Sequence, residues 1–246
     1  MKKLGFTLAE VMVALALIGV ITSLTIPTFV ASNKNRTHSA KAATTVSAVE
    51  NAFTSMIAAE AVQDLSETKF AKDSNALNFG RYIKLSSFTN SMNTYYSEGT
   101  PFREIHNSNN TESEFGTPDI IFELKNGALV MFKKVAPTSI IQPEEEGAEP
   151  ITLESLGGTI SGSIGKLTID VNGTDSPNIW GRDVFHFRIG NDGLLYPAGS
   201  LNYSILEKGD AKNLWNEEGD LSCMNNGNKT IGCCARLLEN NYEVDF

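Results

Sequence analysis

Histidine and cysteine are scarce in this sequence of 246 residues, with three of each. The histidines, His38, His106 and His186, lie far apart and show none of the short spacings that metal-binding histidines use. The sequence also lacks a nucleophile elbow and an HExxH motif, and the glycine-rich run at 157–165 lacks the spacing of a phosphate-binding loop. We therefore predict that the chain is not an enzyme.

Positive charge is also in short supply. The 20 Lys and Arg residues are outnumbered by 29 Asp and Glu residues, which gives a formal net charge of −9. A chain with this balance is a poor general binder of the nucleic acid backbone, because that binding depends on Lys and Arg pairing with phosphates. We therefore expect no nucleic acid partner.

Charge of either sign is almost absent near the N-terminus. Between Lys3 and Lys34 the only charged residue is Glu10. A helix rises about 1.5 Å per residue, so about 20 apolar residues cross a bilayer, and the segment 11–30 is long enough. We predict one membrane-spanning helix over about residues 8–30. A lone carboxylate in hydrocarbon costs on the order of a few kcal/mol, so it usually has a function and a partner.

A short run near the N-terminus resembles a known processing signal. Gly5-Phe6-Thr7-Leu8-Ala9-Glu10 follows two lysines and precedes an apolar helix, and it looks like the leader of a type IV prepilin. The wider family covers type IV pilins and the pseudopilins of type II secretion. The resemblance implies cleavage between Gly5 and Phe6 by a prepilin peptidase, followed by methylation of the new Phe6 amine. Gly19 and Pro27 lie where many such helices carry a glycine and a proline.

Glu10 matches the acidic residue that the family carries four positions after the new N-terminus. Cleavage would leave a positive amine on Phe6, and we expect that this amine cannot reach its own Glu10 without disrupting the first helical turn. It can pair with Glu10 of a neighbouring subunit shifted along the axis, and loss of one partner of such a buried pair costs roughly 3–5 kcal/mol. We therefore predict that Glu10, with Gly19 and Pro27, acts in assembly of an open helical filament.

The resemblance also implies a layout and a location. Residues 1–5 would form the leader, 6–63 the N-terminal helix, and 64–246 a globular pilin-like domain with a C-terminal cysteine loop. The precursor would cross the inner (cytoplasmic) membrane once with its C-terminal domain outside, and then join other pilin subunits in an extracellular or periplasmic filament. Cleavage removes two lysines, so the net charge would change from −9 to −11 before the new amine is counted.

Beyond the apolar segment the helical pattern resumes. Apolar residues recur at three- and four-residue spacing, namely Val46, Val49, Phe53, Met56, Ile57 and Ala61. This spacing predicts that the helix continues to about residue 63. Its apolar face needs a partner, and we expect that partner to be a sheet of the same chain.

Several strands are predicted after the helix. The apolar runs 120–124 and 128–132 flank Asn126-Gly127, which predicts a hairpin with a primed turn. Residues 165–171 and 183–189 are predicted to form two more strands. A helix followed by antiparallel strands is an α+β order. It fits the pilin plan, in which a long N-terminal helix packs on an antiparallel β-sheet.

All three cysteines, Cys223, Cys233 and Cys234, lie near the C-terminus. In an exported chain they predict one disulfide that closes a short loop, from Cys223 to either Cys233 or Cys234. Pilin-like domains often close a C-terminal loop in this way. Two alternatives stay open: a strained bond between the adjacent Cys233 and Cys234, and three reduced cysteines that pack as small apolar side chains.

One loop carries oxygen-bearing side chains at close spacing: Asp170, Asn172, Asp175 and Asp183. Hard cations such as calcium take six to eight oxygen ligands. The run is not an EF-hand, because no Glu closes a twelve-residue loop. Two interpretations stay open, a calcium site and a cluster of Asx and glycine turns that joins two strands. No other cofactor is expected.

The sequence favours a structural subunit of a type IV pilus or related filament. Two rivals share the same leader: a pseudopilin of a type II secretion system, and a minor pilin that acts as an adhesion or DNA-uptake receptor. An ordinary signal peptide would instead release an exported protein that starts near Asn33. Glu10 argues against that interpretation, because a carboxylate at the edge of the apolar region has no use there. A plain membrane anchor is a further alternative.

Overall fold

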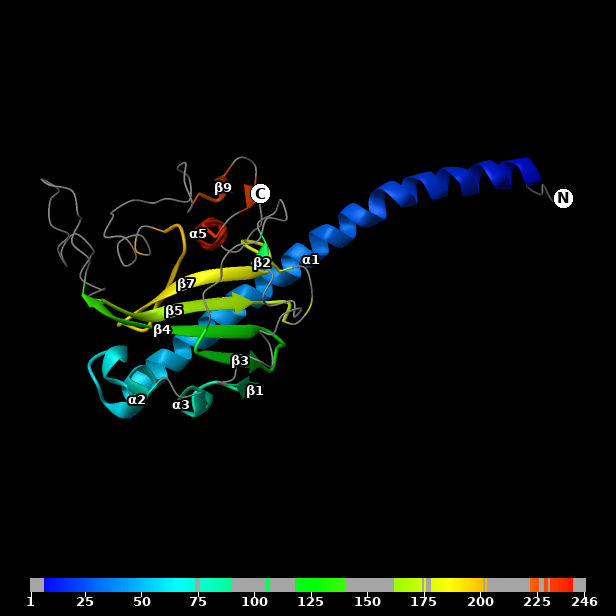
Figure 1. The fold of residues 1–246 in the computed structure, drawn as a ribbon. Helices are drawn as coiled ribbons and strands as arrows, with labels where there is room; N and C mark the ends of the chain where they lie inside the picture. Colours follow the sequence, from blue (N-terminus) through cyan, green and yellow to red (C-terminus); the bar gives the residue numbers. More distant parts are fainter. Residues whose placement is uncertain are drawn as a thin grey trace, which may run out of the picture. The chain divides into compact units, whose positions relative to one another are not determined.

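The structure is a computed structural model of the chain. It describes residues 7–73, 76–89, 105–106, 118–139, 162–173, 175, 178–200, 202, 222–225, 228–229 and 231–240. The chain divides into two compact units, Met1–Thr37 and His38–Phe246. Helix α1 (Leu8–Glu60) runs through both units, and the other elements belong to the second (Figure 1).

The first unit contains the apolar part of α1. The helix continues through Pro27, which has no backbone N–H to donate. The hydroxyl groups of Ser23, Thr25 and Thr28 donate to backbone carbonyl oxygens three or four residues earlier, at 2.8–2.9 Å. These hydroxyls are therefore satisfied inside the helix, as apolar surroundings require.

The part of α1 in the second unit forms one wall of the hydrophobic core. Its buried apolar side chains recur at three- and four-residue spacing, as predicted: Ala42, Val46, Val49, Ala52, Phe53 and Met56. The helix ends at Glu60, and Ala61 follows with a left-handed φ of 52°. The prediction that this helix face packs on a sheet of the same chain is confirmed, because the same hydrophobic core contains side chains of the sheet.

A six-stranded sheet faces this part of α1 (Figure 1). Each strand pairs antiparallel with its neighbours, which confirms the α+β fold with a long N-terminal helix and an antiparallel sheet. In sheet order the strands are β1 (Leu85–Thr89), β3 (Ile120–Leu124), β4 (Leu129–Ser139), β5 (Gly162–Asp170), β7 (Val184–Gly190) and β8 (Leu195–Pro197). Two short ladders add β2 (Ile105–His106) with β6 (Asn178–Ile179), and β9 (Met224–Asn225) with β10 (Asn228–Lys229).

The β3–β4 hairpin forms where it was predicted, but its turn differs. A primed turn with Asn126 and Gly127 at its centre needs positive φ at Asn126, the first central residue. Gly127 has φ 77°, whereas Ala61 is the only non-glycine residue with positive φ in the described part of the chain, so Asn126 does not. Gly127 N–H donates to the Leu124 carbonyl, and Leu124 N–H donates to the Ala128 carbonyl. The prediction of a primed turn was wrong. The loop is a turn followed by a left-handed glycine, so it holds one residue more than the two-residue loop of a primed turn.

Short helices close one end of the core. These are η1 (Leu65–Glu67), α2 (Lys69–Asp73) and α3 (Ala76–Gly80), and Asp64 caps η1 by accepting from the Ser66 N–H at 2.8 Å. Together with α1 and the sheet they supply five phenylalanines in contact, with ring centroids 4.5–5.7 Å apart: Phe53, Phe70, Phe79, Phe122 and Phe132. At the other end of the sequence, α5 (Cys233–Glu239) packs against β7 and β8.

The phenylalanine cluster yields a test of how α1 is fixed to the sheet. We expect Phe53→Ala to lower the free energy of unfolding by about 3–5 kcal/mol, because it leaves a cavity beside the rings of Phe70 and Phe79. Thr54→Ala is the matched control, since Thr54 is exposed on the same turn and should change stability by less than about 0.5 kcal/mol. Urea unfolding of the full chain in detergent measures both, and equal effects would contradict this packing.

Candidate functional site

The first turn of α1 is closed by a reciprocal cap between Thr7 and Glu10. The Glu10 carboxylate accepts from the Thr7 backbone N–H and from the Thr7 hydroxyl, both at 2.8 Å. The Thr7 hydroxyl oxygen in turn accepts from the Glu10 backbone N–H at 3.3 Å. Thr7 was missed as a site residue, although Thr-x-x-Glu before an apolar run is the capping-box pattern and was visible in the sequence.

The other N-terminal residues singled out by sequence lie around this cap. Gly5 and Phe6, the predicted processing residues, fall outside the described residues. Because Phe6 precedes Thr7, the Glu10 carboxylate already reaches back to the amide next to the predicted new terminus. Gly19 lies in the helix interior, where a Cβ would meet nothing within 4 Å, and Pro27 lies eight residues further on.

The first unit presents an apolar surface. By length and composition α1 can cross a membrane, with a mean hydropathy of 2.2 over its most apolar 18 residues, none of which is buried. The exposed large side chains include Leu8, Met12, Leu15, Leu17, Ile18, Val20, Ile21, Leu24, Ile26 and Phe29. An exposed apolar surface of this kind marks contact with lipid or with other protein.

Residues 1–26 match the prokaryotic N-terminal methylation motif. The chain carries the N-terminal signature of type IV pilins and pseudopilins. This methylation motif implies processing by a prepilin peptidase and assembly with other pilin subunits. Proteins with it are structural and usually not enzymes, and the apolar helix fits membrane anchoring. No curated protein and no solved structure matches the chain.

The predicted disulfide from Cys223 forms with Cys233, one of its two predicted partners. Cys223 and Cys233 form a disulfide with a Cα–Cα distance of 4.1 Å, which closes a loop ending at the start of α5. Cys234 keeps a free thiol that is fully buried in the core, and burial raises its pKa. The thiol is therefore protonated and inert at neutral pH.

The predicted oxygen-rich loop joins β5 to β7. Asp183 accepts hydrogen bonds from the Ile179 N–H at 2.9 Å and from Asn172 Nδ2 at 3.0 Å. Asp170 Oδ1 accepts from the Asn172 N–H at 3.1 Å. Asp170 Oδ2 and Asn172 Oδ1 are buried and have no hydrogen-bond partner within the described part of the chain. Asp175 is exposed.

The structure thus brings Asp170, Asn172 and Asp183 together through an Asx turn at Asp170 and the side-chain hydrogen bond from Asn172 to Asp183. Among the described residues, no group of three or more His, Cys, Asp or Glu side chains is placed to hold a metal ion. Calcium binding by this loop stays a prediction.

The carboxyl groups of Asp170 and Asp183 in this loop are costly to ionise. Burial, and then the nearby Asp183 carboxylate, raises the pKa of Asp170 well above its usual range. Burial also raises the pKa of Asp183 to about 6, against hydrogen bonds and Arg182 that favour its charged form. Arg182 Nε lies 3.6 Å from Asp183 Oδ1 and is partly exposed. Each group therefore binds protons more tightly in the folded chain than in the unfolded one.

The same loop contacts α1 and the β3–β4 turn. Lys41 Nζ donates to the Val171 carbonyl at 3.1 Å. Gly173 has φ 75°, and a Cβ there would lie 2.6 Å from the Gly127 carbonyl oxygen. Only glycine suits this conformation and this close approach. The loop therefore helps to hold the start of the second unit's helix against the sheet.

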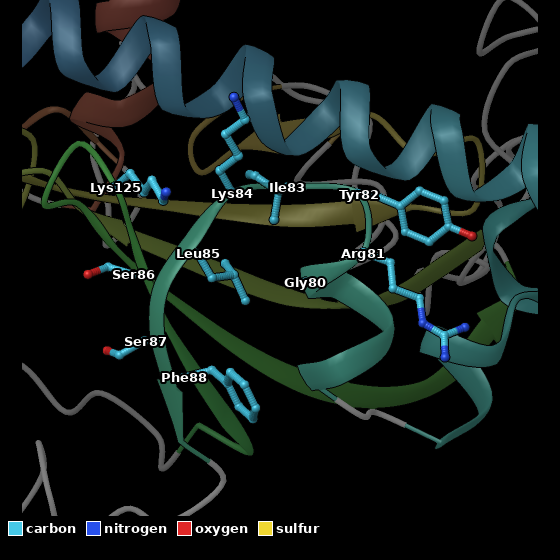
Figure 2. Close-up of a pocket in the computed structure, with 10 residues that line it drawn as sticks. All are labelled: Gly80, Arg81, Tyr82, Ile83, Lys84, Leu85, Ser86, Ser87, Phe88 and Lys125. Atoms are coloured by element: carbon cyan, nitrogen blue, oxygen red, sulfur yellow. The ribbon is translucent and has the colours of Figure 1, made fainter.

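A further feature lies at the edge of the sheet, where α3 is followed by β1. Residues 80–88 and Lys125 line an open groove of about 970 Å³ (Figure 2). Three of its lining residues are cations, Arg81, Lys84 and Lys125, and none is an Asp or Glu. In a chain with a net charge of −9 this is a local excess of positive charge.

The buried carboxyl groups predict an inverted pH dependence. Because their pKa values are raised on folding, the contribution of these two groups to the free energy of unfolding is most favourable below the unfolded pKa, about 4, and that of Asp183 is lost as pH rises through about 6. We expect Asp170→Asn to flatten this fall and to raise stability at pH 7 by about 1 kcal/mol or more, because it removes a buried carboxyl group that is costly to ionise and has one oxygen without a hydrogen-bond partner in the described part of the chain. Urea unfolding between pH 4 and 8 in EGTA measures this, with exposed Asp73→Asn as the control; a destabilised Asp170→Asn would contradict it.

Calcium occupancy has its own test. If the loop binds calcium, millimolar calcium should raise the thermal midpoint of the wild-type chain relative to EGTA. Asp183→Asn should abolish that shift, because it removes one of the oxygen-rich side chains that the loop brings together. An unchanged wild-type midpoint in calcium would favour the turn-cluster interpretation.

Proposed function

We propose that the chain is a structural subunit of a type IV pilus or related filament. The supporting observation is the methylation motif at residues 1–26, which continues into the exposed apolar first part of α1, where Glu10 is the only charged residue between Lys3 and Lys34. In this proposal a prepilin peptidase cuts between Gly5 and Phe6. The first part of α1 then holds the subunit in the inner membrane, with the C-terminal domain outside, until it enters the filament.

Glu10 has two roles in this proposal. In the single chain its carboxylate caps α1 through Thr7. In the filament it also meets the new amine of a neighbouring subunit, and the pair neutralises both charges in the dry helical core. Removing one partner of such a pair costs roughly 3–5 kcal/mol, so a subunit with the wrong stagger is strongly disfavoured.

The motif is shared by pseudopilins, so a subunit of a type II secretion system is the second candidate. Deletion of the gene separates the two. Loss of long surface filaments would support a pilus subunit, and a secretion defect without loss of surface filaments would support a pseudopilin. The acidic balance of the chain argues against a third role, that of a DNA-uptake receptor.

We expect Glu10→Ala and Glu10→Gln to be processed normally but to assemble poorly, with filament yield below about a tenth of wild type. Gln can still accept the Thr7 hydrogen bonds but carries no charge, so Glu10→Gln separates the effect of the charge from that of the helix cap. Thr7→Ala is the matched control, because it removes the capping hydroxyl and keeps the carboxylate. Filament yield by shearing and immunoblot is the measurement, and near-normal assembly of Glu10→Gln would contradict the charge role.

A further inference from the structure

Two cations, Lys34 and Arg36, follow the apolar segment of α1 within the first unit. Both lie on the helix, and both side chains are exposed. The sequence of α1 carries no carboxylate between Glu10 and Glu50. Neither cation therefore has an acidic residue three or four positions away, which is the spacing at which ion pairs form along a helix. We call these two residues the basic pair.

The packing of the fold does not explain the basic pair. Among the residues that the structure describes, the side chains of Lys34 and Arg36 make no ion pair or hydrogen bond. The next cation along α1, Lys41, is different. It belongs to the second unit, and its Nζ donates to the Val171 carbonyl at 3.1 Å. The basic pair thus lies between the apolar segment and the first cation that the domain uses.

The two side chains leave the helix on nearly opposite sides. A helix turns by about 100° per residue, so Arg36 lies about 200° around the axis from Lys34. A single protein surface that packs on one side of α1 meets only one of them. A layer of lipid headgroups surrounds a membrane-spanning helix on all sides and meets both. Arginine and lysine are also the side chains that bind phosphate, arginine through paired N–H groups and lysine as a point charge.

The length of the uncharged part of α1 places the basic pair at the level of headgroups. Residues 11–33 carry no charge, and at about 1.5 Å per residue they span about 35 Å. With a typical helix tilt of about 20° this is about 32 Å along the membrane normal, close to the hydrocarbon thickness of about 30 Å. When Lys34 and Arg36 lie in one headgroup layer, Glu10 therefore lies at the opposite boundary of the hydrocarbon.

We propose that Lys34 and Arg36 bind the phosphate groups of anionic phospholipids, on opposite sides of α1, in the leaflet from which the chain continues into its C-terminal domain. The inference rests on the proposed function, in which the first part of α1 stays in the inner membrane before the subunit enters the filament. Cations next to a membrane-spanning helix are attracted to anionic lipids, and the attraction is screened by salt.

The contact determines how deep the waiting subunit lies. An uncharged apolar helix can shift along the membrane normal at little cost, whereas charged groups at both ends resist a shift in either direction. The basic pair holds one end at the headgroups and Glu10 marks the other. The predicted cleavage site after Gly5 is thereby kept beside the opposite face of the membrane.

The test measures lipid preference in full-length protein reconstituted in phosphatidylcholine vesicles. Electron paramagnetic resonance compares the association of spin-labelled phosphatidylglycerol with that of spin-labelled phosphatidylcholine. We expect Lys34→Gln/Arg36→Gln to lower the preference for phosphatidylglycerol about threefold or more, and 0.5 M NaCl to lower that of the wild type. Arg36→Lys should keep most of the preference, because it keeps the charge.

The matched control is Lys69→Gln/Lys72→Gln, which removes the same charge from exposed positions on α2 in the second unit. It should leave the preference unchanged, and an equal loss would overturn the inference, because total charge would then explain the result. Circular dichroism checks that each variant is folded.

An unchanged preference in Lys34→Gln/Arg36→Gln would also overturn the inference. If that variant then assembled poorly, the basic pair would instead serve a protein contact, within its own chain or with a neighbouring subunit. Neither result affects the proposed function. Release of the wild-type chain from cell membranes by alkaline carbonate would contradict the membrane stage of the proposed function, and the inference with it.

Discussion

One carboxylate in a long segment with no other charge constrains the N-terminal part of this molecule. Between Lys3 and Lys34 no cation balances the Glu10 carboxylate, so its charge needs a hydrogen bond or a charged partner when the segment enters an apolar environment. The structure supplies a cap through Thr7. The methylation motif implies a second partner, an amine created by processing. Glu10 is thus hydrogen-bonded within its own chain before processing, and in the proposed filament the amine of a neighbouring subunit becomes its second partner.

Much of the fold was predictable because its signals are local. The three- and four-residue spacing of apolar residues identified the face of α1 that packs on the sheet, and the runs flanking 126–127 identified β3 and β4. The sequence left open whether Cys223 pairs with Cys233 or Cys234, whether those two pair with each other, and whether all three stay reduced, since adjacent cysteines look equivalent in sequence. The structure pairs Cys223 with Cys233, and helix α5 directs Cys234 into the core.

The remaining features depend on contacts between distant segments, which periodicity does not report. Strand β1 was not predicted, because its five residues carry no clear strand pattern and it is defined by its pairing with β3. The sheet register likewise determines the close approach of Gly173 to the Gly127 carbonyl and the burial of Asp170 beside Asp183. The turn at 126–127 was mistaken for a primed one, since Asn-Gly suits that type and only the strand register showed the extra residue.

The central claim is that Glu10 stands just inside a terminus made by cleavage. Intact-mass and N-terminal peptide mass spectrometry of protein purified from cells tests it directly. The account predicts a chain that starts at Phe6 and carries a methyl group on its amine. A chain that still begins at Met1, or one that starts beyond residue 30, would contradict it.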